Sequence, residues 1–313
     1  MNVLFPRLHL FLLFVILPSS LIEGRRISEI KCSEYRNQTI KSSAIIPLTI
    51  NPRPIVHQNF ECSKTVDLIV GGETAKPAEF PHQALLGWPK VDDPQQLDFR
   101  CGGSLISDRY VLTAAHCFRD GDSPIVVRLG EHDVLNDRDN QADFDIEAIV
   151  LHPNYKFSSV YHDIALVKLT EAVLFSKIIR PACLWTSLDV NVTSVVATGF
   201  GLTEFVGQSS NLLLKVKLDF LDRNECSRQY AGFRTFKRGI IEEQLCVGSK
   251  RGSKDTCQGD SGGPIQVITE PKGCTYHIIG ITSTGSACGV GKSPSIYTRV
   301  ASYLDWIEGM VWK

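Results

Sequence analysis

The stretch Asp255-Thr256-Cys257-Gln258-Gly259-Asp260-Ser261-Gly262-Gly263-Pro264 sets one serine among glycines, and an apolar run, Pro264 to Thr269, follows directly. Glycine has no Cβ, so the backbone at Gly259 can approach a substrate closely. Two other short motifs stand earlier in the chain, Leu112-Thr113-Ala114-Ala115-His116-Cys117 and His162-Asp163-Ile164-Ala165-Leu166. The three motifs together supply a serine, a histidine and an aspartate.

These three residue types suit hydrolysis of peptide bonds. A serine hydroxyl is a poor nucleophile at neutral pH, so an imidazole must accept its proton during attack on an amide carbonyl. The same imidazole then donates that proton to the leaving amine. Ser261 alone among glycines is a weak signal, and a lone histidine is usually structural, so the prediction depends on the conjunction of the motifs.

The three motifs, in this chain order, resemble those of the trypsin-like (chymotrypsin-fold) serine proteases, and the likeness covers nearly everything from Ile69 onward. The resemblance implies a catalytic triad of Ser261, His116 and Asp163, in which the aspartate fixes the tautomer of the imidazole. It also implies an oxyanion hole formed by the backbone N–H groups of Gly259 and Ser261. The implied fold is all-β, with two antiparallel six-stranded β-barrels packed together and a C-terminal α-helix.

The residues themselves also favour antiparallel β structure. From residue 69 onward, short runs rich in Val, Ile, Leu and Thr are separated by Gly, Pro, Asn and Asp, which leaves no room for crossover helices and predicts barrels or a sandwich. The expected strands include Gln83 to Trp88, Ile125 to Leu129, Ile164 to Leu169, Ser194 to Thr198, Leu212 to Phe220, Pro264 to Thr269 and His277 to Thr282. Val300, Leu304, Ile307 and Val311 fall at helical spacing and predict a closing helix.

The amino-terminal part divides into a predicted signal peptide, residues 1–24, and a predicted pro-segment, residues 25–68. Arg7 precedes an apolar run of about ten residues, which is typical of a signal peptide and well short of the roughly 20 that span a bilayer. The pro-segment is polar and shows no sustained helical or alternating period, so we expect it to have little core of its own. Residues 69–313 are the predicted peptidase domain.

The boundary at Leu68-Ile69-Val70-Gly71-Gly72 predicts an activation site. In the resembling family, cleavage before this Ile frees an α-amino group that pairs with the aspartate matching Asp260. A buried carboxylate without a cationic partner is costly, so the uncut chain should be inactive. Leu68 stands where many relatives have Arg or Lys, and it predicts an upstream activating protease that prefers Leu or another apolar residue.

The resemblance places Asp255 at the base of the primary substrate pocket, where a carboxylate selects Arg or Lys before the scissile bond. The alternative is a solvated loop aspartate. Ser283, Gly285 and Ser295 are the other expected substrate-binding residues. Ser295 stands where relatives usually have Gly, and Thr284 replaces a usual aromatic residue, so the catalytic rate and the subsite preference stay open.

Ten cysteines behind a signal peptide indicate an oxidising compartment and a secreted, extracellular protein. By resemblance, Cys101 pairs with Cys117, Cys226 with Cys246, Cys257 with Cys288, and Cys183 with Cys62 of the pro-segment. Cys32 and Cys274 remain, and Cys274 pairs either with Cys32 or with another molecule. Asn37 and Asn191 begin glycosylation sequons that are compatible with secretion.

Several stretches look particularly like the snake-type clip-domain proteases of arthropod extracellular cascades, among them Arg180-Pro181-Ala182-Cys183-Leu184-Trp185. A clip domain has six cysteines and this pro-segment has two, so a complete clip domain is not expected. The expected partners are protein substrates, the activating protease and a serpin-type inhibitor. A formal net charge of −1 without a basic block gives no reason to expect nucleic acid or a membrane surface.

No cofactor and no metal are expected. The acidic loop from Glu131 to Asp145 overlaps where some relatives bind calcium, but ordinary solvated charge is the favoured interpretation. The sequence therefore predicts a secreted zymogen of a serine endopeptidase that cuts after Arg or Lys, in a cascade of limited proteolysis. The alternative is a protease homologue with little or no catalysis that acts as a binding or regulatory module.

Overall fold

The computed structural model describes residues 24–39, 41–45, 55–59, 73–118, 122–136, 141–201, 209–249, 260–270, 275–285 and 294–313. The predicted signal peptide (apart from Gly24) and the predicted activation site at Leu68 and Ile69 lie outside these residues. Within the described ranges, no helix is long and apolar enough to cross a membrane.

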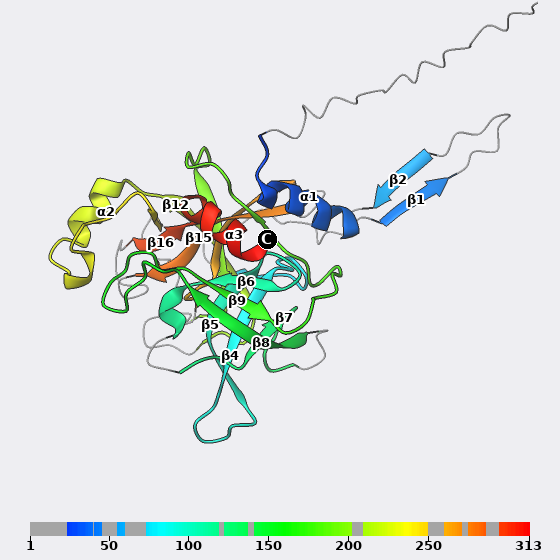
Figure 1. Cartoon of the computed structure of the whole chain (residues 1–313), viewed down its shortest axis with the longest axis horizontal. Coiled ribbons are helices and arrows are strands. Elements are labelled where there is room, and N and C mark those ends of the chain that lie inside the picture. The colour runs from blue at the N-terminus through cyan, green and yellow to red at the C-terminus, as the bar shows by residue number, and fades with distance from the viewer. Residues whose placement is uncertain are drawn as a thin grey trace, which may run out of the picture.

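The first half of the predicted peptidase domain folds into a closed barrel of six antiparallel strands (Figure 1). Around the barrel the order is β4-β5-β6-β9-β8-β7. The strands are β4 (Gln83–Pro89), β5 (Leu97–Leu105), β6 (Tyr110–Thr113), β7 (Val126–Leu129), β8 (Ala142–Leu151) and β9 (Ala165–Leu169). Leu86, Leu105, Leu129 and Val167 fill the interior and are fully buried.

The second half forms another ring of six antiparallel strands, in the order β14-β11-β12-β13-β16-β15, which the β15–β14 pairing closes. These strands are β11 (Ser194–Gly199), β12 (Leu214–Phe220), β13 (Gln244–Gly248), β14 (Pro264–Glu270), β15 (Thr275–Thr284) and β16 (Ser295–Arg299). Two short strands join its edge: β10 (Cys183–Leu184) pairs with β15, and β3 (Glu73–Thr74) pairs with β12. The predicted fold of two six-stranded barrels is confirmed.

One apolar cluster joins the two barrels and the C-terminal helix. Leu85 and Leu112 of the first barrel, Ile278 of the second and Ile307 of the helix belong to it. The helix α3 (Leu304–Val311) follows the 3-10 turn η5 (Val300–Tyr303), as the helical spacing of apolar residues predicts. Among the described residues, the other short helices are η2 (Ala115–Phe118), α2 (Arg223–Gln229) and η3 (Arg234–Phe236).

The pro-segment contains regular structure, which the sequence prediction missed. Residues Ile27–Thr39 form the helix α1, and β1 (Lys41–Ile45) pairs antiparallel with β2 (Ile55–Asn59). In Figure 1, α1 lies beside α3, so the helix of the predicted pro-segment rests on the predicted peptidase domain. The absence of a sustained period in the sequence therefore did not reveal this helix and this pair of strands, and the expectation of little core of its own is not contradicted by them.

The contact between α1 and α3 is mostly polar. The Arg26 guanidinium donates to both carboxylate oxygens of Glu308, at 3.0 and 2.9 Å, and the Ser28 hydroxyl donates to Oε1 of Glu308 at 2.6 Å. At the other end of the helix, the Trp312 indole N–H donates to the hydroxyl of Tyr35 at 2.9 Å. Polar pairs of this kind give no periodic apolar stripe, which explains why the sequence pattern did not reveal the helix.

Candidate active site

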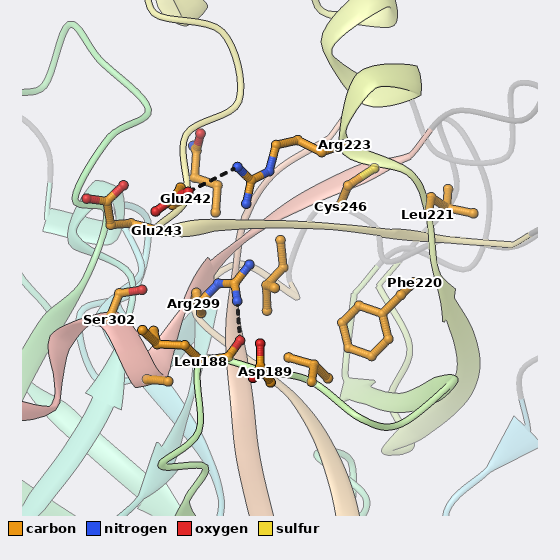
Figure 2. A pocket seen from close by; sticks show the side chains of 14 residues that line it. Leu188, Asp189, Phe220, Leu221, Arg223, Glu242, Glu243, Cys246, Arg299 and Ser302 are labelled. Atoms are coloured by element: carbon orange, nitrogen blue, oxygen red, sulfur yellow. Dashed lines mark hydrogen bonds and ion pairs between the residues drawn. The ribbon is translucent and has the colours of Figure 1, made fainter.

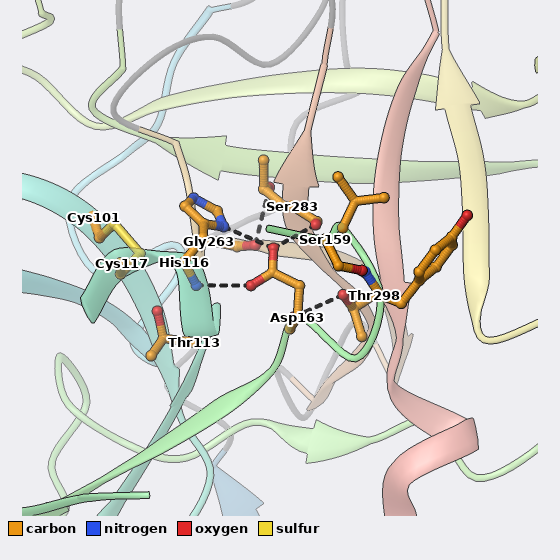
Figure 3. Close-up of polar contacts among 12 residues, drawn as sticks. Cys101, Thr113, His116, Cys117, Ser159, Asp163, Gly263, Ser283 and Thr298 are labelled. Atoms are coloured by element: carbon orange, nitrogen blue, oxygen red, sulfur yellow. Dashed lines mark hydrogen bonds and ion pairs between the residues drawn. A yellow bond between two sulfur atoms is a disulfide. The ribbon is translucent and has the colours of Figure 1, made fainter. Parts of the chain in front are cut away.

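His116 lies on η2, directly after β6 of the first barrel (Figure 3). The disulfide between Cys101 of β5 and Cys117 ties this short helix to the neighbouring strand. Ala115 is fully buried. The backbone that carries His116 is thus anchored on both sides.

Asp163 faces His116 from the turn that leads into β9. Its Oδ2 lies 2.7 Å from Nδ1 of His116, and its Oδ1 accepts a hydrogen bond from the backbone N–H of His116 at 2.8 Å. The Thr298 hydroxyl donates to the backbone carbonyl of Asp163 at 2.7 Å. The residue is 2% exposed, so the carboxylate is held in one direction away from solvent.

The carboxylate of Asp163 stays ionised although it is buried. Burial by itself raises the pKa of a carboxyl group, but the opposite charge of His116 and hydrogen bonds from His116 and Ser283 more than offset this, so the pKa of Asp163 lies below its usual value. An ionised acceptor at Nδ1 favours the imidazole tautomer that leaves Nε2 free to accept a proton.

Ser283 was expected to bind substrate. Its buried hydroxyl donates a short hydrogen bond to Oδ2 of Asp163. The structure therefore gives this side chain a contact with the carboxylate that faces His116, which the sequence analysis did not anticipate. Ser283 is the penultimate residue of β15.

Ser261 lies in the turn before β14 of the second barrel, against the first barrel. The Gly102 N–H donates to the Ser261 carbonyl at 2.8 Å. Gly262 has a positive φ of 78°, and a Cβ there would lie 2.1 Å from Oγ1 of Thr113 and 3.1 Å from the backbone N of Ala114. Because Ala114 is two residues before His116, this close approach brings the serine turn against the segment that carries the histidine.

Asp260, the expected activation partner, lies at the side of this turn. Its Oδ1 accepts a hydrogen bond from the Gly201 N–H at 3.0 Å, and a Cβ on Gly199 would lie only 1.9 Å from the same oxygen. The carboxylate therefore packs directly on the backbone at the end of β11, where only glycine fits.

Ser295 and Gly285 face each other at the expected substrate pocket. A Cβ on Gly285 would lie 2.6 Å from the hydroxyl oxygen of Ser295, and Ser295 is 1% exposed. Thr284 precedes Gly285 on β15 and is partly exposed. Asp255 and Gly259, the predicted pocket base and oxyanion-hole residue, lie outside the described residues.

The disulfides correct one prediction. Cys101–Cys117 and Cys226–Cys246 form as expected. Cys183 bonds to Cys32 and not to Cys62, so the predicted Cys62–Cys183 pair is wrong, and Cys32 is not a partner for Cys274. The family pattern identifies the cysteine of the protease region, but only the docked position of α1 decides which pro-segment cysteine reaches it. Cys62, Cys257, Cys274 and Cys288 lie outside the described residues.

Glu131 is not a solvated loop residue, contrary to expectation. It is 6% exposed, its Oε1 accepts hydrogen bonds from the backbone N–H groups of His132 and Asp133 at 3.0 Å, and its Oε2 pairs with Arg128 at 3.3 Å. Both carboxylate oxygens thus serve the local fold and the arginine.

A pocket of about 790 Å³ opens beside the end of β16, between the loop at residues 188–190, β13 and η5 (Figure 2). Arg299 ends β16 and donates from Nη1 to the Leu188 carbonyl at 2.6 Å. Side chains of both charge signs line the pocket, namely Asp189, Arg223, Glu242, Glu243 and Arg299. Thr298, whose hydroxyl donates to the carbonyl of Asp163, directly precedes Arg299 on β16. The contact between Arg299 and Leu188 therefore also holds the part of β16 that contacts Asp163.

The comparisons with known proteins agree with this geometry. The family model described as trypsin matches residues 69–307. Serine protease snk of Drosophila melanogaster is 44% identical over 293 residues, which are 93% of this chain and 66% of that protein. Serine protease Hayan of the same organism is 41% identical over 253 residues, 78% of this chain and 39% of that protein. Phenoloxidase-activating factor 3 of Holotrichia diomphalia is 39% identical over 268 residues, 79% of this chain and 74% of that protein.

Proposed function

Because the chain belongs to the trypsin family of serine proteases, we propose that it is a secreted serine endopeptidase made as an inactive precursor. The observation that carries the proposal is the hydrogen-bonded pair of His116 and Asp163 beside the turn of Ser261. Nδ1 of His116 lies 2.7 Å from Oδ2 of Asp163. The chain spans about two thirds of the length of serine protease snk and 39% of that of Hayan, so the role of the whole protein is part of the proposal.

In the proposed mechanism, Oγ of Ser261 attacks the scissile carbonyl while Nε2 of His116 takes the hydroxyl proton. Asp163 keeps the proton on Nδ1 and stabilises the imidazolium that forms. His116 then returns the proton to the leaving amine, and water repeats the sequence to release the acyl group. The low pKa of Asp163 supports these roles because a protonated carboxyl could not stabilise the imidazolium.

The backbone N–H groups of Gly259 and Ser261 are the proposed oxyanion hole. Donors aimed at the developing negative charge contribute more in a site that excludes water than in solution. The positive φ of Gly262 and its close packing on Thr113 support this assignment, because they restrict the turn that carries the Ser261 N–H.

Cleavage between Leu68 and Ile69 is the proposed activation step, after which the new α-amino group pairs with Asp260. The position of Glu73, four residues after Ile69, supports this step. Glu73 pairs with Lys215 across β3 and β12, and Lys215 pairs with Thr198 across β12 and β11. Glu73 is therefore about 10 Å, or two strand spacings, from the end of β11, on which Asp260 packs.

Four residues, 69–72, precede Glu73 and span about 13 Å when fully extended. An amino group freed at Ile69 thus has the reach to meet Asp260, whereas a chain cut after Lys64 would carry four extra residues. This supports an activator that cuts after Leu68, as Leu and not Arg or Lys at this position also suggests.

We further propose cleavage after Arg or Lys, with Asp255 at the base of the pocket and Ser283, Gly285 and Ser295 along its walls. Expected partners are protein substrates, the activating protease and a serpin-type inhibitor. The name of the relative phenoloxidase-activating factor 3 says that it activates another protein, which supports a place for this chain in an extracellular cascade of limited proteolysis. Asn37 and Asn191 are exposed, which fits their proposed glycosylation.

One observation favours the alternative of a catalytically weak homologue that binds partners. The Ser295 hydroxyl lies where any side chain on Gly285 would be, so the two pocket walls approach closely. A narrow pocket would admit Arg or Lys poorly without changing the triad.

The test is hydrolysis of fluorogenic peptides ending in Arg, Lys, Phe or Leu by protein cut after Leu68, with Ser261→Ala as the matched control. Amino-terminal sequencing first establishes Ile69 as the new terminus. Turnover after Arg and Lys that disappears in the control is the expected result. No turnover by protein with an Ile69 terminus would contradict the protease proposal and favour the binding module.

A further inference from the structure

His162, the residue before Asp163, has an unusual backbone conformation. Its φ is +57°, and among the described residues only one other non-glycine residue, Ala78, has a positive φ. Left-handed conformations of this kind are unfavourable for residues with a Cβ and persist only where the surroundings hold them. Histidine is among the non-glycine residues that adopt positive φ more readily, and the contacts of His162 with its surroundings add to this preference.

The conformation of His162 determines the direction of Asp163. The carbonyl of His162 accepts a hydrogen bond from the N–H of Ile164 at 2.9 Å, so the three residues form a tight turn with Asp163 at its centre. The next strand residue is fixed as well, because the Ile164 carbonyl accepts from the His152 N–H at 3.1 Å. A change in the backbone conformation of His162 would therefore change the direction of Asp163.

The imidazole of His162 anchors this turn to the C-terminal segment. Its Nδ1 lies 3.1 Å from the hydroxyl of Tyr303, the last residue of η5, which is 5% exposed. The ring of His152 also supports the imidazole of His162, because the two rings are stacked with centroids 5.4 Å apart and planes at 19°. His152 in turn makes edge contacts with Tyr303 and Trp306, both at 5.1 Å.

The electrostatic surroundings keep this stack uncharged. Burial lowers the pKa of His162, the nearby Glu243 raises it and Arg238 lowers it, with a net lowering. Burial also lowers the pKa of His152, and the neighbouring His162 lowers it further. A neutral His162 has a ring nitrogen that can accept the Tyr303 hydrogen, which is the geometry observed.

We propose that His162 is a positioning residue for catalysis: through Tyr303 it holds the left-handed turn that aims the carboxylate of Asp163 at His116. The inference rests on the proposed protease function. It adds to the contacts that Ser283, Thr298 and His116 make with Asp163, because these act on the aspartate itself and His162 acts on the backbone that carries it.

The test compares variants of the full chain cut after Leu68, with active sites counted by a serine-directed fluorophosphonate. We expect His162→Ala to lower kcat about 10- to 100-fold with little change in KM, since small misplacements of a catalytic group have effects of this size. His162→Asn should restore most of the rate, because asparagine tolerates the left-handed conformation. Tyr303→Phe, which removes only the hydroxyl, should lower kcat in the same direction but less.

The acid limb of the pH profile of kcat/KM gives a readout that a merely structural role would not move. A displaced Asp163 stabilises the His116 imidazolium less, so this limb should shift to lower pH in His162→Ala and in Tyr303→Phe. Tyr35→Phe is the matched control, because it also removes a tyrosine hydroxyl. This hydroxyl contacts Trp312, just after α3, and does not touch the turn at Asp163.

Rates and acid limbs equal to those of the active wild type in both His162→Ala and Tyr303→Phe would overturn the proposal. His162→Asn as impaired as His162→Ala would also overturn it, because the left-handed turn would then not be what His162 supplies. If His162→Ala does not fold, Tyr303→Phe decides alone. A wild-type protein that hydrolyses no peptide contradicts the protease function as well, which separates that failure from the failure of positioning alone.

Discussion

Arg26 and Glu308 are joined by two hydrogen bonds, from Nε to Oε1 at 3.0 Å and from Nη2 to Oε2 at 2.9 Å, so the first described helix is bound to the last. The side chain of Glu308 is 13% exposed and also accepts from the Ser28 hydroxyl. A partly buried, bidentate pair of this kind is stronger than an ordinary surface ion pair. Helix α1 is thus bound to the rest of the folded protein.

Replacing this carboxylate should destabilise the protein measurably. We expect Glu308→Gln to lower the free energy of unfolding by about 1 to 2 kcal/mol, because Arg26 loses one of its two charged partners and keeps only Asp305. Chemical denaturation of the uncut protein measures the change. The matched control is Lys31→Ala, which removes the exposed Lys31–Glu34 pair and should cost about 0 to 0.5 kcal/mol. Equal effects of the two variants would show that α1 is not held through Glu308.

The disulfide between Cys32 and Cys183 can be tested directly. Mass spectrometry of an unreduced digest should find a peptide containing Cys32 linked to one containing Cys183. Cys32→Ser should also lower stability by about 2 to 5 kcal/mol, because the bond closes a long loop of the unfolded chain. A digest in which Cys183 is linked to Cys62 would contradict the structure and restore the pairing expected from the sequence.

His82 predicts a pH dependence of stability that is independent of catalysis. It is 1% exposed and hydrogen-bonds to Gln266, whose amide donates to Thr198. Burial lowers its pKa to about 3, with the Gln266 bond opposing and the charge of Arg180 adding to the shift. The unfolded chain therefore takes up this proton first, near pH 6.5, and the folded one only near pH 3.

Above about pH 6.5, His82 therefore does not reduce the free energy of unfolding. As the pH falls from there towards 3, this free energy decreases by up to about 1.4 kcal/mol per pH unit. His82→Asn should flatten the plot of unfolding free energy against pH in this range. His277→Asn, which replaces a partly exposed histidine on β15, is the control and should keep the wild-type slope. An unchanged slope in His82→Asn would mean that other groups produce the acid sensitivity.

The carboxylate of Asp163 should matter far more for rate than for binding. Asp163→Asn keeps the shape but offers an amide where His116 needs an acceptor, so we expect kcat to fall about 10⁴-fold. Peptide hydrolysis by protein cut after Leu68 measures it, with Asp98→Asn on the β4–β5 hairpin as the control. A fall of less than about tenfold would show that Asp163 does not hold the tautomer of His116.

Ser295 should limit the substrate pocket. Ser295→Gly removes the hydroxymethyl group that faces Gly285, and we expect kcat/KM for Arg and Lys peptides to rise about tenfold or more, the scale at which one small group matters in a pocket. Ser187→Gly, at an exposed loop position, is the control. Unchanged or lower values in Ser295→Gly would mean that the serine does not narrow the pocket.

The barrels and the closing helix could be predicted because their signals are local. Several strands are short and mostly apolar runs, such as Gln83–Pro89, and the apolar residues of α3 repeat at helical spacing. The triad motifs were recognisable for the same reason, since His116, Asp163 and Ser261 each stand in a short characteristic stretch.

The missed features depend on partners that are distant in the sequence. Helix α1 is held by Glu308, about 280 positions away, and by the bond from Cys32 to Cys183, 151 positions away. The hydroxyl of Tyr303 that contacts the imidazole of His162 belongs to a residue 141 positions away. Pairwise contacts of this kind leave no periodicity, so a single sequence does not reveal them.

The bond between Cys32 and Cys183 has a practical consequence for following activation. A cut after Leu68 adds one water and releases nothing, because residues on both sides of the break stay covalently joined. Gel filtration and unreduced electrophoresis would see the same particle before and after the cut, and an antibody against α1 would still capture both forms. Only reduction, or an antibody specific for the new end at Ile69, would distinguish the two.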